Sequence, residues 1–153
     1  MRASQMLLII ILFASCEAQM ELLTSFNKSL SNEEKLTIYK IGFLSSSSPK
    51  NQLLPNYEVL DSIQLNSSQI DSLNRSLTDT SNYIISDQKN CVLEASYGIR
   101  SGKHFFGYTA LIGKEPCMKF HIMKYGTGIE KTYQLRENNT LLPLLSAYFE
   151  KKR

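Results

Sequence analysis

Apolar and polar residues alternate along much of the chain, and a two-residue period of this kind predicts β-strands. Residues 36–43 and 57–65 alternate and are rich in β-branched and aromatic side chains, so we expect a strand in each. In the second of these strands, Val59, Ile63 and Leu65 are expected to face the core. Four further runs, separated by short turns, predict an antiparallel meander in the C-terminal half. They cover residues 91–99, 104–112, 118–122 and 129–135.

Apolar positions three or four residues apart predict helices in three other segments. Residues 17–30 are expected to form a short amphipathic helix or a tether. A second helix is expected to start at an N-cap near Asn66 and to end near Leu77. Residues 141–149 form an apolar stretch compatible with a terminal helix, in which Pro143 fits only the first turn.

The order of these elements predicts an α+β fold. We expect an antiparallel sheet made of the four-stranded meander and one or two N-terminal strands, with two or three helices on one face. Residues 45–55 are predicted to be a loop and residues 78–82 a polar connector. The predicted organisation is a signal peptide at residues 1–15, a tether or short helix at 16–34, and a single α+β domain at 35–153.

The first residues have the pattern of an export signal. Arg2 is followed by an unbroken apolar run from Met6 to Phe13. As a helix this run would be about 12 Å long, far short of the roughly 30 Å hydrocarbon core of a bilayer. The apolar region of a secretory signal peptide needs only about 7–15 residues, so export is predicted and a transmembrane anchor is not.

The segment Phe13-Ala14-Ser15-Cys16 resembles the lipobox of bacterial lipoproteins, although Phe13 stands where that family usually has leucine. With the Lys-, Asn-, Ser- and Ile-rich composition, the chain is similar to small envelope lipoproteins of Bacteroidota. This resemblance implies that the chain is cut before Cys16, that Cys16 is acylated with palmitate-type chains, and that the lipid holds the protein on a membrane of the cell envelope. The alternative is cleavage after Ala18, which would release a secreted chain that begins at Gln19.

Removal of the signal leaves Cys91 and Cys117 as the two unmodified cysteines. Two thiols in an exported protein are usually paired, so a disulfide is expected. In a regular meander the first and third strands lie roughly 9–10 Å apart, whereas a disulfide needs Cα atoms within about 7 Å. A bridge therefore requires both cysteines to lie at strand ends.

Charge is distributed unevenly along the chain, although the net charge of +3 over 153 residues is too small to predict nucleic-acid binding. Residues 16–99 hold six Lys/Arg and ten Asp/Glu, a net −4, whereas residues 100–153 hold ten and four, a net +6. The basic meander could face an anionic surface or partner, or it could be an ordinary solvated sheet face. The residues concerned are Arg100, Lys103, Lys114, Lys119, Lys124 and Lys131.

The sequence contains no motif for nucleophilic, metal-dependent or phosphate-binding catalysis. His104 and His121 could act as bases, but no spacing pairs either with a carboxylate. Cys117 and His121 have a spacing found between zinc ligands, with Cys91 and His104 as further donors. On a strand, however, four residues span about 13 Å, too far for one metal ion. We therefore expect no cofactor, no metal and no enzymatic activity.

These observations predict an exported, lipid-anchored binding or scaffolding protein of the cell envelope, whose partner is an envelope protein or an anionic surface. Three alternatives stay open. The first is a toxin-neutralising or inhibitor protein, and the second is a secreted enzyme that uses a histidine. The third is a secreted eukaryotic glycoprotein, because Asn-x-Ser/Thr sequons occur at Asn27, Asn66, Asn74 and Asn138.

Overall fold

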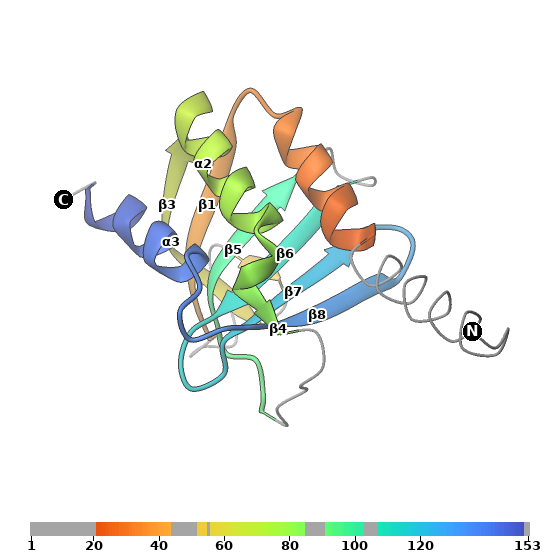
Figure 1. The fold of residues 1–153 in the computed structure, drawn as a ribbon, viewed down its shortest axis with the longest axis vertical. Helices are drawn as coiled ribbons and strands as arrows, with labels where there is room; N and C mark the ends of the chain where they lie inside the picture. The colour runs from red at the N-terminus through yellow and green to blue at the C-terminus, as the bar shows by residue number, and fades with distance from the viewer. Residues whose placement is uncertain (1–20, 44–51, 55, 85–90, 103–106, 152–153) are drawn as a thin grey trace, which may run out of the picture.

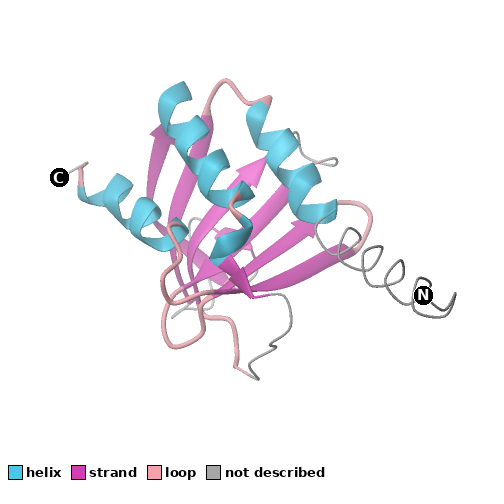
Figure 2. Cartoon of the chain, in the orientation of Figure 1, coloured by secondary structure: helices cyan, strands magenta, loops and turns pink. Residues whose placement is uncertain are grey.

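The computed structural model describes residues 21–43, 52–54, 56–84, 91–102 and 107–151. In this part of the chain, eight strands form one antiparallel sheet, and helices cover one of its two faces (Figure 1). Figure 2 shows the helices as a separate layer in front of the strands. The predicted α+β class is therefore confirmed, with more strands than the sequence indicated.

Strands from both halves of the chain lie side by side in this sheet. They are β1 (Leu36–Phe43), β2 (Gln52–Leu54), β3 (Tyr57–Leu65), β4 (Tyr83–Ile84), β5 (Ala95–Ser101), β6 (Tyr108–Gly113), β7 (Lys119–Lys124) and β8 (Ile129–Leu135). Their order in space is β2-β3-β1-β5-β6-β7-β8-β4. The run from β5 to β8 confirms the predicted meander, and β1 joins the N-terminal strands to it through antiparallel pairing with β5.

The helices begin and end near the residues that the sequence indicated. Residues 21–31 form an N-terminal helix, α2 is Ser67–Thr78, and α3 is Leu141–Glu150. Asn66 caps α2: its side-chain oxygen accepts the Gln69 N–H at 3.0 Å, and the Gln69 side chain accepts the Asn66 N–H at 3.0 Å. Pro143 lies in the first turn of α3, where a missing N–H breaks no helical hydrogen bond.

The N-terminal helix is part of the hydrophobic core. Leu23, Phe26 and Leu30 are each at most 1% exposed, and the Phe26 ring lies 5.9 Å from the ring of Tyr108 and 6.0 Å from that of Phe120. The described part of residues 17–30 is thus a packed helix. The folded unit includes it, so the domain boundary predicted at residue 35 lies too late in the chain.

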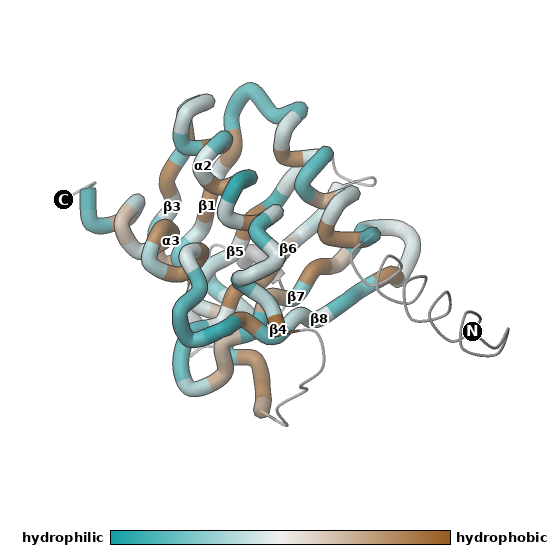
Figure 3. The backbone as a smooth tube through the Cα atoms, viewed as in Figure 1, coloured by the Kyte–Doolittle hydropathy of each residue, from teal (hydrophilic) through white to brown (hydrophobic). Residues whose placement is uncertain are grey.

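The main core lies between the helix layer and the sheet. Leu73 of α2, Leu145 of α3 and Ile99 of β5 are fully buried there. Figure 3 shows hydrophobic positions along the strands behind the helices. This burial of apolar surface is the main source of stability in a fold of this size.

A buried asparagine joins the end of α2 to the start of α3. Asn82, in the 3-10 turn η1 (Thr80–Asn82), is 1% exposed. Its amide nitrogen donates to the Ser76 carbonyl at 2.7 Å and to the Thr140 hydroxyl at 3.0 Å. Its side-chain oxygen accepts the Thr140 N–H at 2.8 Å. The contacts satisfy backbone groups at two helix ends, which would otherwise lose their hydrogen bonds on burial.

Some sequence-based boundaries were wrong. The predicted loop at 45–55 contains β2, and β4 follows directly after the predicted connector. Strands of three and two residues are too short to show a period. Residues 91–94 do not belong to a strand, because β5 begins at Ala95. Residues 45–51 and 103–106 lie outside the described part of the chain.

A bulge explains the wrong orientation predicted for Val59. The register between β1 and β3 shifts between Lys40 and Ile41. A bulge reverses the side-chain alternation beyond it, because one residue is left without a partner. Ile63 packs on the main core, as predicted, whereas Val59 packs with Ile41 in a different cluster.

Candidate functional site

The sheet face opposite the helices, called the helix-free face below, carries a second apolar cluster. Ile41, Tyr57, Ala95 and Leu111 are its buried members. They come from four strands, β1, β3, β5 and β6. The partly buried residues around them are Tyr39, Val59, Leu93 and Met123. The sheet is thus apolar on both faces near its centre.

A groove of about 480 Å³ lies on the helix-free face. Its apolar lining comes from the start of β3, from residues 92–93, and from β6 and β7, and its polar lining includes a lysine, a histidine and a threonine. The lining residues are Asn56, Tyr57, Val92, Leu93, Leu111, Lys119, His121, Met123 and Thr132. The volume falls in the range of small-molecule sites, which are mostly apolar with a few polar groups.

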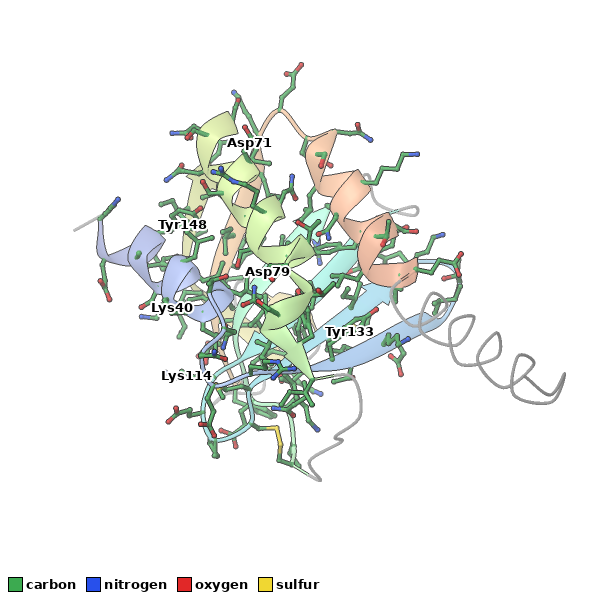
Figure 4. All side chains as sticks on the ribbon, in the orientation of Figure 1. Lys40, Asp71, Asp79, Lys114, Tyr133 and Tyr148 are labelled. Atoms are coloured by element: carbon green, nitrogen blue, oxygen red, sulfur yellow. A yellow bond between two sulfur atoms is a disulfide. The ribbon has the colours of Figure 1, made fainter. Side chains whose placement is uncertain are left out.

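The predicted pairing of Cys91 with Cys117 is confirmed. The two residues form a disulfide with Cα atoms 5.9 Å apart, drawn as a yellow bond in Figure 4. Both lie outside regular strands, Cys91 before β5 and Cys117 between β6 and β7. The distance between the first and third meander strands therefore does not apply to them. Both cysteines lie beside strand ends, which is what a bridge between these segments requires.

The disulfide and two hydrogen bonds hold residues 91–94 against the sheet, where they form one wall of the groove. The Lys119 ammonium donates to the Cys91 carbonyl at 2.9 Å. The Tyr57 hydroxyl donates to the Leu93 carbonyl at 3.1 Å. A non-strand segment at this place is thereby fixed at both ends, and the apolar Leu93 side chain faces the groove.

His121 contributes an imidazole ring to the groove lining. Its Nδ1 lies 2.7 Å from the hydroxyl of Thr132, its cross-strand neighbour, and its Nε2 lies 3.6 Å from a carboxylate oxygen of Glu130. Burial lowers the pKa of His121, and the Glu130 carboxylate raises it in part. With a pKa below its ordinary value of 6.5, the imidazole is mainly neutral at pH 7.

Thr132, His121 and Glu130 have the hydroxyl, imidazole and carboxylate of a hydrolase triad, but not its geometry. The Glu130 side chain is 66% exposed and its nearest oxygen is beyond hydrogen-bond distance of the ring. Thr132 lies inside β8, where backbone N–H groups point along the sheet and perpendicular to the side chains. These N–H groups cannot converge on an oxyanion above the hydroxyl. The contact is a polar cross-strand pair.

The six basic residues expected to form one anionic-partner face do not share a face. Lys124 and Lys131 lie on the helix-covered side, with their ammonium groups 5.8 Å from the ring centre of Tyr108 and 5.6 Å from that of Tyr133. Both follow the parity of buried core residues on their strands. The prediction that all six basic residues lie on one face is therefore wrong.

Two of the other basic residues lie on the helix-free face. The Arg100 guanidinium is 5.9 Å from the ring centre of Tyr125, and Lys119 lines the groove. Lys114 is exposed in the turn between β6 and β7 (Figure 4). Lys103 lies outside the described residues. Of the five that the structure describes, Lys119 alone lines the groove.

Cys117 and His121, which have a spacing found between zinc ligands, contact other residues in the structure. Cys117 is bonded to Cys91, so neither cysteine is available as a thiolate ligand. His104 lies outside the described residues, and within those residues no three His, Cys, Asp or Glu side chains gather as a metal site.

The signal segment at residues 1–15 and the lipidation candidate Cys16 lie outside the described residues. Within the described ranges, no helix has the length and apolar character needed to cross a bilayer.

No protein family matches this chain, and no curated protein and no solved structure is significantly similar to it. Neither an enzyme family nor a catalytic motif is therefore found for it.

Sequence reasoning did not find the groove. Its clearest signal is the run Thr109-Ala110-Leu111-Ile112 in β6, where apolar residues occupy both parities. A continuous apolar run indicates a strand buried on both faces. Tyr57 and Leu93 carry no such signal, since they reach the groove from distant parts of the chain.

Proposed function

We propose that the protein is an exported, lipid-anchored binding protein of the cell envelope that holds an apolar ligand in the groove on its helix-free face. The groove carries this proposal. It is concave and mainly apolar, its side wall is fixed by a disulfide, and its few polar groups lie at defined places. These are the properties of a ligand site.

A binding role fits this groove better than catalysis. The Lys119 ammonium is hydrogen-bonded to a carbonyl, and the His121 ring to a threonine hydroxyl in a regular strand. Neither contact activates a nucleophile in the manner of a base paired with a serine or cysteine. The polar groups can orient a bound molecule, whereas the described residues offer no machinery to break a bond in it.

Export is supported by Arg2 with its following apolar run, and anchoring by the lipobox-like segment ending at Cys16. The Cys91–Cys117 disulfide is typical of proteins that fold outside the cytoplasm. Asn27, the first sequon of the glycoprotein alternative, is 6% exposed and packs within the fold. A glycan on this side chain would need the N-terminal helix to be displaced, so this observation favours the lipoprotein.

Anchoring is tested by intact mass of the mature protein and by incorporation of radiolabelled palmitate. We expect a label on the wild-type chain, a mass that corresponds to cleavage before Cys16, and no label on Cys16→Ala. Ser15→Ala is the matched control and should retain the label, because alanine keeps a small residue there. An unlabelled wild-type chain that begins at Gln19 would refute the anchor.

Ligand binding is tested by native mass spectrometry of protein purified from its own envelope. Wild-type protein is expected to carry a bound small molecule. Met123→Glu places a charge in the groove and should remove that molecule. Lys124→Glu, the adjacent residue on the helix-covered side, should keep it. Equal loading of both variants, with native circular dichroism, would contradict the groove as the site, as would an empty wild-type protein.

A further inference from the structure

Lys119 places a positive charge in the mainly apolar groove. The Lys119 side chain is half-buried, and its ammonium donates one hydrogen bond, to the Cys91 carbonyl at 2.9 Å. An ammonium has three donors. Among the described residues no carboxylate forms an ion pair with Lys119. The groove therefore holds a positive charge that a neutral carbonyl only partly compensates.

Other cations of the sheet are placed differently. Lys124 and Lys131 lie over aromatic rings on the helix-covered side, and Arg100 lies over Tyr125. Lys119 instead shares the groove lining with the apolar side chains of Leu111 and Met123. A charge beside apolar surface is stabilised by an opposite charge that shares its environment. The complementary ligand thus carries a negative group at the Lys119 end.

The Glu130 carboxylate lies beside the groove, 3.6 Å from Nε2 of His121. Glu130 is the cross-strand partner of Met123, and Met123 is four residues from Lys119 along β7. Four strand residues span about 13 Å. The Glu130 side chain leans from there toward His121, which is two residues, or about 7 Å, from Lys119 along the strand. In the described part of the chain its ion-pair contact is with the His121 ring and not with the Lys119 ammonium.

The backbone hydrogen bonds around the groove indicate whether a peptide or a hydrocarbon chain fits it better. β6 and β7 are inner strands, and each pairs with a neighbour on both sides. Their N–H and C=O groups are used within the sheet, so the amides of a bound peptide would find few partners there. Burying unpaired amides is unfavourable. A hydrocarbon body has no such requirement.

We propose that the groove binds an acyl-chain carboxylate, with the carboxylate on the Lys119 ammonium and the chain along β7 over Leu111 and Met123. This inference rests on the proposed function and specifies its ligand class. The His121 ring, hydrogen-bonded to the Thr132 hydroxyl and beside the Glu130 carboxylate, forms the polar edge of this path.

The test compares decanoate, decan-1-ol and decyltrimethylammonium, three probes with the same chain and different head groups. Each is titrated below its micelle-forming concentration into the full chain carrying Cys16→Ala, so that no acyl group on the protein contacts the probe. Binding is measured by calorimetry and located by amide chemical shifts. We expect decanoate to bind about tenfold more tightly than decanol, with shifts in β6 and β7, since a charge-assisted hydrogen bond contributes this much. Decyltrimethylammonium should bind most weakly.

Substitutions then test whether Lys119 causes the preference for a carboxylate head group. Lys119→Met should remove the preference of decanoate over decanol, and Lys119→Arg should keep most of it. Lys114→Met, which removes an exposed lysine outside the groove lining, is the matched control and should bind as the parent does. A dispersed amide spectrum for each variant shows that it is folded.

Each contrary result has a separate meaning. Equal binding of decanoate and decanol would overturn the carboxylate inference and leave an apolar ligand site. Binding of none of the three probes would overturn the proposed function itself. Equal losses in Lys119→Met and Lys114→Met, or shifts confined to another surface, would overturn the role of Lys119.

Discussion

The two faces of the sheet are built from the same strands and differ in what surrounds them. Ala110, Phe120 and Ile122 point toward the helices and are fully buried. Their neighbours Leu111 and His121 point the other way and line the groove. Helices complete the packing on the first face, whereas the second keeps a hollow beside its apolar residues. Successive positions of one strand can therefore serve stability and binding separately, because a strand alternates its side chains between faces.

This difference is tested most strongly by removing a large side chain from the helix-covered face. Phe120→Ala should lower the free energy of unfolding by about 3–5 kcal/mol, because it leaves a cavity among Phe26, Tyr83 and Tyr133. Met123→Ala, three residues along on the other face, should cost much less, because its side chain is only partly buried. Urea denaturation measures both. Similar losses would show that the two faces contribute equally to stability.

The disulfide affects both faces, since it closes the chain and also holds a wall of the groove. Its cysteines are 26 residues apart in sequence. Replacing both by serine should lower the free energy of unfolding by about 3 kcal/mol, the size expected for a loop of this length. Probe binding in the groove should fall as well. The measurement is denaturation with and without a thiol reductant; a wild-type protein insensitive to the reductant would argue against the bridge.

The Asn82 network belongs to the helix-covered side alone. Asn82→Ala should lower the free energy of unfolding by about 1–3 kcal/mol, because the Thr140 N–H and the Ser76 carbonyl lose a partner. Probe affinity in the folded variant should be unchanged, since Asn82 does not line the groove. Asn138→Ala, a change at an exposed asparagine in the nearby turn, is the matched control and should leave stability nearly unchanged. A loss of affinity in Asn82→Ala would connect the two faces.

The smallest effect concerns pH and the helix-free face. The pKa of His121 lies below its ordinary value of 6.5, so the unfolded chain takes up a proton there more readily than the folded one. Stability is unaffected above pH 6.5 and falls as the pH drops from 6.5 toward the lowered pKa. An NMR titration of the imidazole should show this pKa. Glu130→Gln should lower it further, because the carboxylate favours the protonated ring. A titration midpoint above 6.5 would contradict the burial of the ring.

Long periodic segments are the part of the fold that the sequence predicted best. The β1 and β3 ranges agree with the predicted ones, and α2 starts at its predicted cap. β2 and β4 were missed because two or three residues contain no period. The orientation of Val59 was missed because a bulge depends on the pairing of two strands, and neither strand reveals it alone.

The sequence predicted those parts of the candidate site that can be recognised from a single property of each residue. Cys91 and Cys117 followed from their number and from the export signal. The placement of Lys124 and Lys131 could have been corrected from parity, since they alternate with core residues of their own strands. The groove could not be predicted, because it combines Tyr57 and Leu93 with the meander through contacts between distant segments.

The burial of the N-terminal helix limits how far the domain could extend from a lipid attached at Cys16. Only four residues lie between Cys16 and residue 21, and a fully extended chain over those five Cα–Cα steps spans at most about 18 Å. Unwinding the helix to gain length would expose Leu23 and Phe26 to water. A lipid on Cys16 would therefore keep the domain close to the bilayer, with little freedom to turn away from its surface.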